Sequence, residues 1–289
     1  MFIAGEEGNY PMHLMFRWAK VSKSGFYEWK DRGPSYTSRR RAMLGRLIMA
    51  LFEASDGTYG YRRIHADLRR SGYWADDETV RQIMRELGLV PCQPRPFRPI
   101  TTVAGDASDT PDLLKRDFTA IVPGTKLVGD ITYIPTWEGW LYLATVLDCA
   151  TKKVVGYAMA DHMRTSLVTE ALKMAARNVT FIPSVTIFHS DRGSQYCSQE
   201  FSDVTRQLGV RRSVGRTGVC YDNAWAESFN GTLKVERVNR TSYPTREHAR
   251  IDITRYIELR YNQVRLHSRL GYITPNEAER LWFNEISAA

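Results

Sequence analysis

The sequence has few cysteines and no long apolar run, and both shortages narrow the class of protein. Its four cysteines, among 289 residues, lie far apart and form no Cys-X-X-Cys pair. We therefore expect neither a disulfide framework nor a zinc site, which suits a reducing cytoplasm. No apolar stretch approaches the roughly 20 residues that cross a bilayer. The N-terminus also lacks the apolar segment of a secretory signal, so we expect no membrane association.

The chain does have an excess of positive charge, and this excess is unevenly placed. The formal net charge is +8. Residues 1–100 carry 17 Lys and Arg against 11 Asp and Glu, whereas the remaining residues carry 23 against 21. A basic first third indicates contact with nucleic-acid phosphates, although a well-solvated surface would give the same count.

Changes in composition and periodicity divide the chain into four parts. Residues 1–90 read as a helical DNA-binding region, in which 38–55, 61–70 and 77–87 have helical spacing and the last two form a plausible helix-turn-helix (about 38–90). Residues 91–118 read as a linker, with five prolines between 91 and 112. Residues 119–240 follow a strand–helix pattern, and 241–289 read as a C-terminal helical extension.

The third part predicts an α/β fold with a mixed five-stranded sheet flanked by helices. The expected strands are 126–134, 140–148, 153–160, 184–189 and 210–214, with helices at 165–178, 198–208 and 223–237. Asp130 falls on the first strand and Asp191 just after the fourth, so the two come close together if those strands are neighbours.

Three carboxylates within this part carry the chemical prediction. Asp130, Asp191 and Glu227 come from two strand-like runs and one helix-like run. Gathered together, they would suit a hard divalent cation such as Mg²⁺, which prefers oxygen ligands. In a basic protein, such a site points to phosphoryl transfer on a nucleic acid.

Several motifs resemble the second reading-frame product of IS3-type bacterial insertion sequences, which are DDE transposases. These motifs are GDITYI around Asp130, HSDRGSQY around Asp191, DNAWAESFNGTLKVE around Glu227, and YNQVRLHSRLGYITPNEA near the C-terminus. DGTYGYRRIHADLRRSGY is similar to the family's helix-turn-helix segment. The resemblance runs from about residue 10 to about 282, and 35 residues separate Asp191 from Glu227, as in the family's DD(35)E pattern.

The resemblance implies a ribonuclease-H-like, retroviral-integrase-like catalytic core at 119–240. It also implies that Asp130, Asp191 and Glu227 are catalytic residues and metal ligands. Two Mg²⁺ ions are expected, with Mn²⁺ able to substitute. The reaction would be strand cleavage at the ends of the insertion sequence, followed by transfer of the 3′-hydroxyl strand. A nuclease that only hydrolyses and a non-catalytic DNA-binding protein are the alternatives.

Further residues and partners follow from spacing and from the family. Lys234, seven residues after Glu227, returns to the same helix face and would grip DNA phosphate, and Asn230 shares that face. His189 is a candidate for supporting Asp191, and phosphate contacts are expected from Arg62, Arg63, Arg69 and Arg70. The expected partners are terminal-repeat and target DNA, further copies of the chain, and an upstream first-frame protein. The expected location is the bacterial cytoplasm, at the nucleoid.

Overall fold

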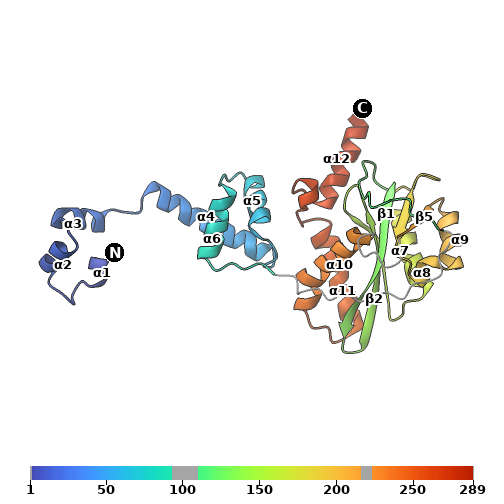
Figure 1. Ribbon diagram of the computed structural model, residues 1–289, viewed down its shortest axis with the longest axis horizontal. Helices are drawn as coiled ribbons and strands as arrows, with labels where there is room; N and C mark the ends of the chain where they lie inside the picture. Colours follow the sequence, from blue (N-terminus) through green and yellow to red (C-terminus); the bar gives the residue numbers. More distant parts are fainter. Residues whose placement is uncertain (1, 93–109, 216–222, 289) are drawn as a thin grey trace.

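The computed structural model describes residues 2–92, 110–215 and 223–288. Helices occupy the N-terminal end of the elongated molecule, and a sheet with covering helices forms the other end (Figure 1). The first three helices, α1 (Phe2–Gly5), α2 (Met12–Trp18) and α3 (Lys23–Asp31), enclose a small cluster of Ile3, Met15, Phe16 and Phe26. The predicted linker lies largely outside the described residues.

The predicted helix-turn-helix forms a compact unit of three helices. These are α4 (Tyr36–Ala54), α5 (Tyr61–Arg70) and α6 (Asp77–Glu86). Leu44, Ile48, Ile64, Leu68 and Val80 face one another in its core, as the helical spacing of the apolar residues requires. Gly72 adopts φ +82° between α5 and α6, a conformation that L side chains rarely adopt.

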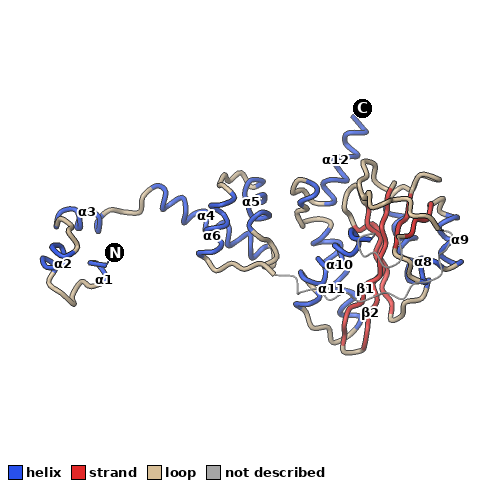
Figure 2. Tube along the Cα trace, viewed as in Figure 1, coloured by secondary structure: helices blue, strands red, loops and turns tan. Residues whose placement is uncertain are grey.

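Five strands form one mixed sheet in the order β3-β2-β1-β4-β5 (Figure 2). The strands are β1 (Lys126–Thr136), β2 (Gly139–Asp148), β3 (Val154–Ala160), β4 (Ile187–Ser190) and β5 (Arg211–Val214). β1, β2 and β3 pair antiparallel, whereas β4 lies parallel to both β1 and β5. The first and fourth strands are therefore neighbours in the sheet. This confirms the condition under which Asp130 and Asp191 were expected to come close together.

Helices cover both faces of the sheet because strand residues alternate between the two faces. One face packs against α7 (Thr165–Asn178), α8 (Ser194–Cys197) and α9 (Gln199–Gln207). Here Gly156 allows close contact, since an added Cβ would lie 2.2 Å from the Ala171 carbonyl oxygen. The other face packs against α10 (Ala224–Glu236) and α11 (Arg246–Arg255).

The C-terminal part is built into this second face. The sequence predicts a single helix over 245–263, but α11 gives way to a π-helical stretch, η3 (Tyr256–Tyr261). Ile253, Ile257 and Tyr261 join Phe229 and Leu233 of α10 in the largest core cluster. The remaining elements are two 3₁₀ turns, η2 (Val238–Arg240) and η4 (Ser268–Leu270), and α12 (Pro275–Ala288), which projects from the body (Figure 1).

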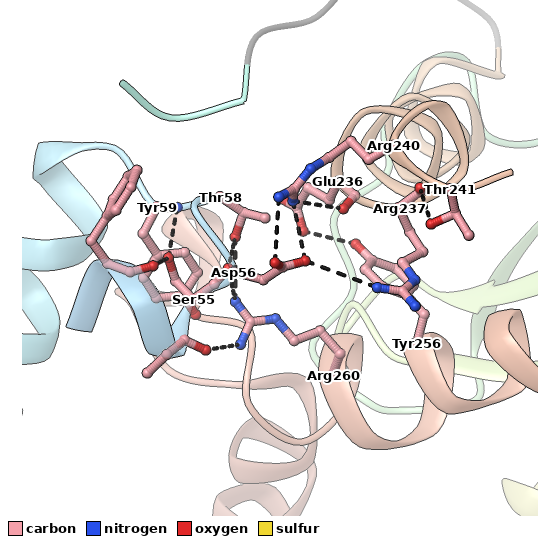
Figure 3. Close-up of polar contacts among 12 residues, drawn as sticks. Ser55, Asp56, Thr58, Tyr59, Glu236, Arg237, Arg240, Thr241, Tyr256 and Arg260 are labelled. Atoms are coloured by element: carbon pink, nitrogen blue, oxygen red, sulfur yellow. Dashed lines mark hydrogen bonds and ion pairs between the residues drawn. The ribbon is translucent and has the colours of Figure 1, made fainter. Parts of the chain in front are cut away.

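Polar contacts join the helix-turn-helix unit to the elements that follow α10. The Asp56 carboxylate accepts from both terminal nitrogens of Arg240, at 3.2 and 3.3 Å (Figure 3). Arg260 donates to the Ala54 and Ser55 carbonyl oxygens at the end of α4 (Figure 3). Leu266 completes the apolar core of the unit. Arg237, at the C-cap of α10, lies 4.0 Å from the Asp56 carboxylate, so the end of the helix that carries Glu227 also meets the helix-turn-helix unit.

Candidate active site

Asp130 and Asp191 approach each other because their strands run side by side in the same direction. Val128 of β1 pairs with His189 of β4, and each aspartate lies two residues beyond its member of that pair. The Asp130 Oδ1 accepts from the backbone N–H of Ile131 at 2.8 Å. Asp191 follows the end of β4, where its Oδ1 accepts from the Gly193 N–H at 3.0 Å. The parallel pair thus brings two carboxylates to one edge of the sheet.

The helix α10 brings the third carboxylate to this edge. Glu227 lies in its first turn, and the helix is tied to β1 by two asparagines. Asn223 Nδ2 donates to the Gly129 carbonyl oxygen at 3.1 Å, and Asn230 Nδ2 donates to Asp130 Oδ2 at 2.9 Å. Asn223 stands at the N-cap position, but its side chain makes no capping hydrogen bond and reaches the sheet instead.

The carboxylates influence one another electrostatically. Burial first, and then the Asp191 and Glu227 charges, raise the pKa of Asp130 to about 7, against the opposing effect of its hydrogen bonds. Burial also raises the pKa of Asp191 and that of Glu227, and the Asp191 charge adds to the effect on Glu227. Like charges near one another in a desolvated site disfavour ionisation. A cation at this position would relieve that repulsion.

Two basic side chains, Lys234 and His189, interact electrostatically with the carboxylates from different surroundings. Burial lowers the pKa of Lys234, while the nearby Asp130 charge opposes this shift. The Lys234 Nζ lies 4.4 Å from the centroid of the Tyr133 ring. His189 is buried on β4, where its Nδ1 lies 2.8 Å from Ser213 Oγ, and its charge favours ionisation of Asp191.

The four arginines expected at DNA phosphates have different surroundings. Arg63 is partly buried, donates to the Leu266 carbonyl oxygen at 3.0 Å and packs over the Tyr59 ring. Arg70 forms an ion pair of 2.5 Å with Glu277 of α12. Arg62 lies over the ring of Tyr61, and Arg69 lies over the exposed ring of Trp74. Arg63 and Arg70 thus make contacts within the chain, between the helix-turn-helix unit and the C-terminal part.

Three residues near the carboxylates were not predicted from the sequence. They are Asn223, Tyr133 and Tyr196, the last of which is buried on α8 with its pKa well above the usual range because of burial and the Asp130 and Asp191 charges. Asn223 and Tyr133 belong to the DNAWAESF and GDITYI motifs, so their places beside the acidic residues were a usable signal. Tyr196 lies in HSDRGSQY, five residues after Asp191.

The side chains at this edge fit a divalent cation in their chemistry. Three carboxylates are gathered here, and the buried Oδ1 of Asn230 has no hydrogen-bond partner among the described residues. All are hard oxygen donors, the kind that Mg²⁺ takes. Within residues 2–92, 110–215 and 223–288, no group of three or more His, Cys, Asp or Glu side chains is already drawn together as a metal cluster. The donor types therefore fit Mg²⁺, although these side chains are not arranged as a formed metal site among the described residues.

Family models match three stretches of the chain. Residues 122–220 match an integrase core domain, and residues 208–275 match a second integrase core model. Residues 38–97 match an HTH-like domain. The integrase core matches contain Asp130, Asp191 and Glu227, and the HTH-like match contains most of α4 and all of α5 and α6.

Named relatives span nearly the whole chain. It is 36% identical over 281 residues to transposase InsF for insertion sequence IS3A of Escherichia coli (strain K12), covering 96% of this chain and 97% of that protein. It is 39% identical over 255 residues to the insertion element IS600 uncharacterized 31 kDa protein of Shigella sonnei, covering 88% and 93%. A solved HTLV-2 integrase catalytic core domain in complex with magnesium aligns with a TM-score of 0.43 and 15% identity, covering 55% of this chain and 98% of that one.

Proposed function

Since the chain belongs to the transposase family of IS3-type insertion sequences, we propose that Asp130, Asp191 and Glu227 are its catalytic carboxylates. The chain is a DDE transposase, a polynucleotidyl transferase with an integrase core and a helix-turn-helix-like DNA-binding domain. The observation that supports the residue assignment is that Asp130 and Asp191 each lie two residues beyond the same β1–β4 pair, while Asn230, on the helix that carries Glu227, donates to Asp130 Oδ2. Nothing about DNA binding alone requires three acidic groups at one edge of a sheet.

The integrase-like family uses divalent metal, and we propose that the three carboxylates hold two Mg²⁺ ions, with Mn²⁺ able to substitute. When bound, such ions activate an attacking oxygen and stabilise the leaving oxygen of a phosphodiester. Asn230 orients Asp130 by donating to its Oδ2 at 2.9 Å. Asn223 fixes the start of α10, and with it Glu227, against β1.

The DNA contacts that we propose fall into two groups. Lys234 lies beside the carboxylates and would hold a phosphate next to the reacting one, with Asn230 close to the same strand. Arg62 and Arg69 present exposed guanidinium groups from α5 for phosphates farther away. Arg63 and Arg70 already make intramolecular contacts, so we propose that they steady the helix-turn-helix unit and contribute to DNA binding mainly through their charge.

The proposed assembly follows from the reaction. Two ends of an insertion sequence must be held together, so we propose a homo-oligomer on terminal-repeat and target DNA, with an upstream first-frame protein as fusion or partner. The division into 1–90, 91–118, 119–240 and 241–289 also stays a proposal, supported by the change in composition after residue 90. We propose that the protein acts at the nucleoid, where the chromosomal DNA lies. No helix among the described residues is long and apolar enough to span a membrane.

The test separates cleavage from binding. Asp130→Asn, Asp191→Asn and Glu227→Gln should each abolish Mg²⁺-dependent cleavage and strand transfer on terminal-repeat DNA, while DNA affinity stays nearly unchanged. Glu170→Gln, at an exposed site on α7, is the matched control and should be active. Substantial cleavage by any of the three site variants would contradict the assignment. A pre-cleaved 3′-hydroxyl substrate that yields no joined product would favour a purely hydrolytic nuclease.

A further inference from the structure

Lys234 rests on an aromatic pair at the rim of the active site. Its Nζ lies 4.4 Å from the centroid of the Tyr133 ring, within the range of a cation–π contact. The Tyr133 ring in turn meets Trp140 nearly edge-on, with centroids 4.9 Å apart and an interplanar angle of 76°. Tyr133 comes from β1 and Trp140 from β2, so the rigid hairpin of these strands fixes both rings.

The topology explains why a side chain from α10 can reach the Tyr133 ring. β4 pairs with β1 only from Lys126 to Val128, whereas β1 continues to Thr136 along β2. Tyr133 therefore stands on a part of β1 beyond its pairing with β4, three residues after Asp130. The contact places the Lys234 ammonium against this ring, and the Asp130 charge acts on the same ammonium.

The contact holds the ammonium without using its hydrogen-bond donors. Among residues 2–92, 110–215 and 223–288, Lys234 has neither a hydrogen-bond acceptor nor an ion-pair partner, although it is half-buried. An ammonium carries three N–H donors, which are costly to leave unmet in a desolvated place. A carboxylate partner would neutralise the charge, whereas the face of a ring attracts it and leaves the donors available. This arrangement suits an incoming anion.

We infer that Tyr133, supported by Trp140, is a positioning residue that holds the Lys234 ammonium ready for a DNA phosphate beside Asp130. The inference rests on the proposed role of Lys234 in DNA contact. Tyr133 acts through Lys234 and is not itself a catalytic group. The alternative is simple packing, for which any apolar side chain of similar size would serve.

Two substitutions at one position distinguish these readings in the full-length chain. Tyr133→Phe keeps the π face, and Tyr133→Leu keeps apolar bulk but removes it. With pre-cleaved terminal-repeat DNA and Mg²⁺, Tyr133→Leu should lower kcat/KM for strand transfer about three- to tenfold, while Tyr133→Phe stays close to wild type. Because the ring is partly exposed, both variants should fold, and equal thermal midpoints would verify this.

A second background makes the test specific for Lys234. In Lys234→Ala, the change from Tyr133 to Leu should have no further effect, since the ring has no ammonium to hold. A full additional loss in that background, or a Tyr133→Phe variant as impaired as Tyr133→Leu, would overturn the inference. If Lys234→Ala alone left DNA affinity and strand transfer unchanged, the proposed DNA contact of Lys234 would be wrong, and the role of Tyr133 would be wrong as well. The carboxylate assignment would stand or fall separately, on its own variants.

Discussion

Replacing Arg265 with Met is expected to destabilise the chain by about 3–5 kcal/mol, because it leaves a buried carboxylate without its partner. The Arg265 and Glu236 side chains are only 6% and 5% exposed. Arg265 donates to Glu236 through Nε at 2.9 Å and Nη2 at 2.7 Å, and the Tyr256 hydroxyl donates to the same carboxylate at 2.8 Å. Glu236 ends α10, so the pair also holds the end of the helix that carries Glu227.

The size of this effect can be compared with an ion pair of similar length at the surface. Arg41 and Glu86 lie 2.6 Å apart, but their side chains are 37% and 61% exposed. Arg41→Met should therefore cost no more than about 1 kcal/mol. Thermal denaturation would show a drop of about 10 °C for Arg265→Met and a small one for Arg41→Met.

A double-mutant cycle tests the physical reason. The double variant Glu236→Gln/Arg265→Met should be less destabilised than the sum of the two single variants by about 2 kcal/mol, because the second change removes the uncompensated charge. Equal losses at the buried and exposed arginines, or strict additivity in the cycle, would refute the reasoning. The loss would then reflect packing and not charge.

Three further predictions concern the site, the sheet and the pH. Asn230→Ala should slow strand cleavage about tenfold by freeing Asp130 Oδ2, and single-turnover kinetics would show it against Thr232→Ala on the exposed side of α10. Gly156→Ala should lower the free energy of unfolding by about 1–3 kcal/mol or more, since its Cβ would collide with α7, and urea denaturation would measure this. His267 should cost stability as the pH drops below about 6.5, because burial and nearby cations lower its pKa to about 3 and the unfolded chain takes up the proton first; since the raised pKa of Asp130 acts in the opposite sense below about pH 7, the wild type is compared with His267→Gln. Burial raises the pKa of Glu236, but Arg265 lowers it further, so the net shift is downward. The stability that the Glu236 carboxylate contributes is therefore present above about pH 4.5 and is lost in stronger acid. Thermal midpoints of the wild type and His267→Gln that shift in parallel with pH would contradict the prediction for His267.

Local patterns predicted most of the elements. The helix at 165–178 and the helix at 61–70 have the bounds expected from their apolar spacing, and the other strands and helices of the sheet region differ by a few residues at their ends. The mixed sheet and its integrase-like class were also predicted correctly. The π-helical stretch Tyr256–Tyr261 was not, because π-helical turns are rare and one turn is too short to shift the apolar spacing of the surrounding α-helix recognisably.

The site was predictable only in part, for a physical reason. Motif and spacing pointed to the carboxylates, and the parallel pairing of β1 with β4, which brings Asp130 toward Asp191, was the condition that the sequence left open. Arg63 donates to the Leu266 carbonyl oxygen because the helix-turn-helix unit packs against the C-terminal part. A count of charged residues in the sequence does not describe this packing. The sequence position of Asn223 also suits an ordinary capping residue. Only the packed structure shows that its side chain donates to the Gly129 carbonyl oxygen. The identity of the metal ligands and DNA contacts stays a prediction.

The placement of β4 beside β1 has a consequence for how the active protein comes into being. β1, β2 and β3 are consecutive and can assemble as a meander, whereas β4 reaches β1 only after the chain has passed through β3 and α7. Such distant parallel pairings form late. A nascent chain therefore displays Asp130 before its acidic neighbour exists, and Glu227 is made last of the three. Truncated protein chains that end before β4 should consequently not cleave the chromosome that encodes them.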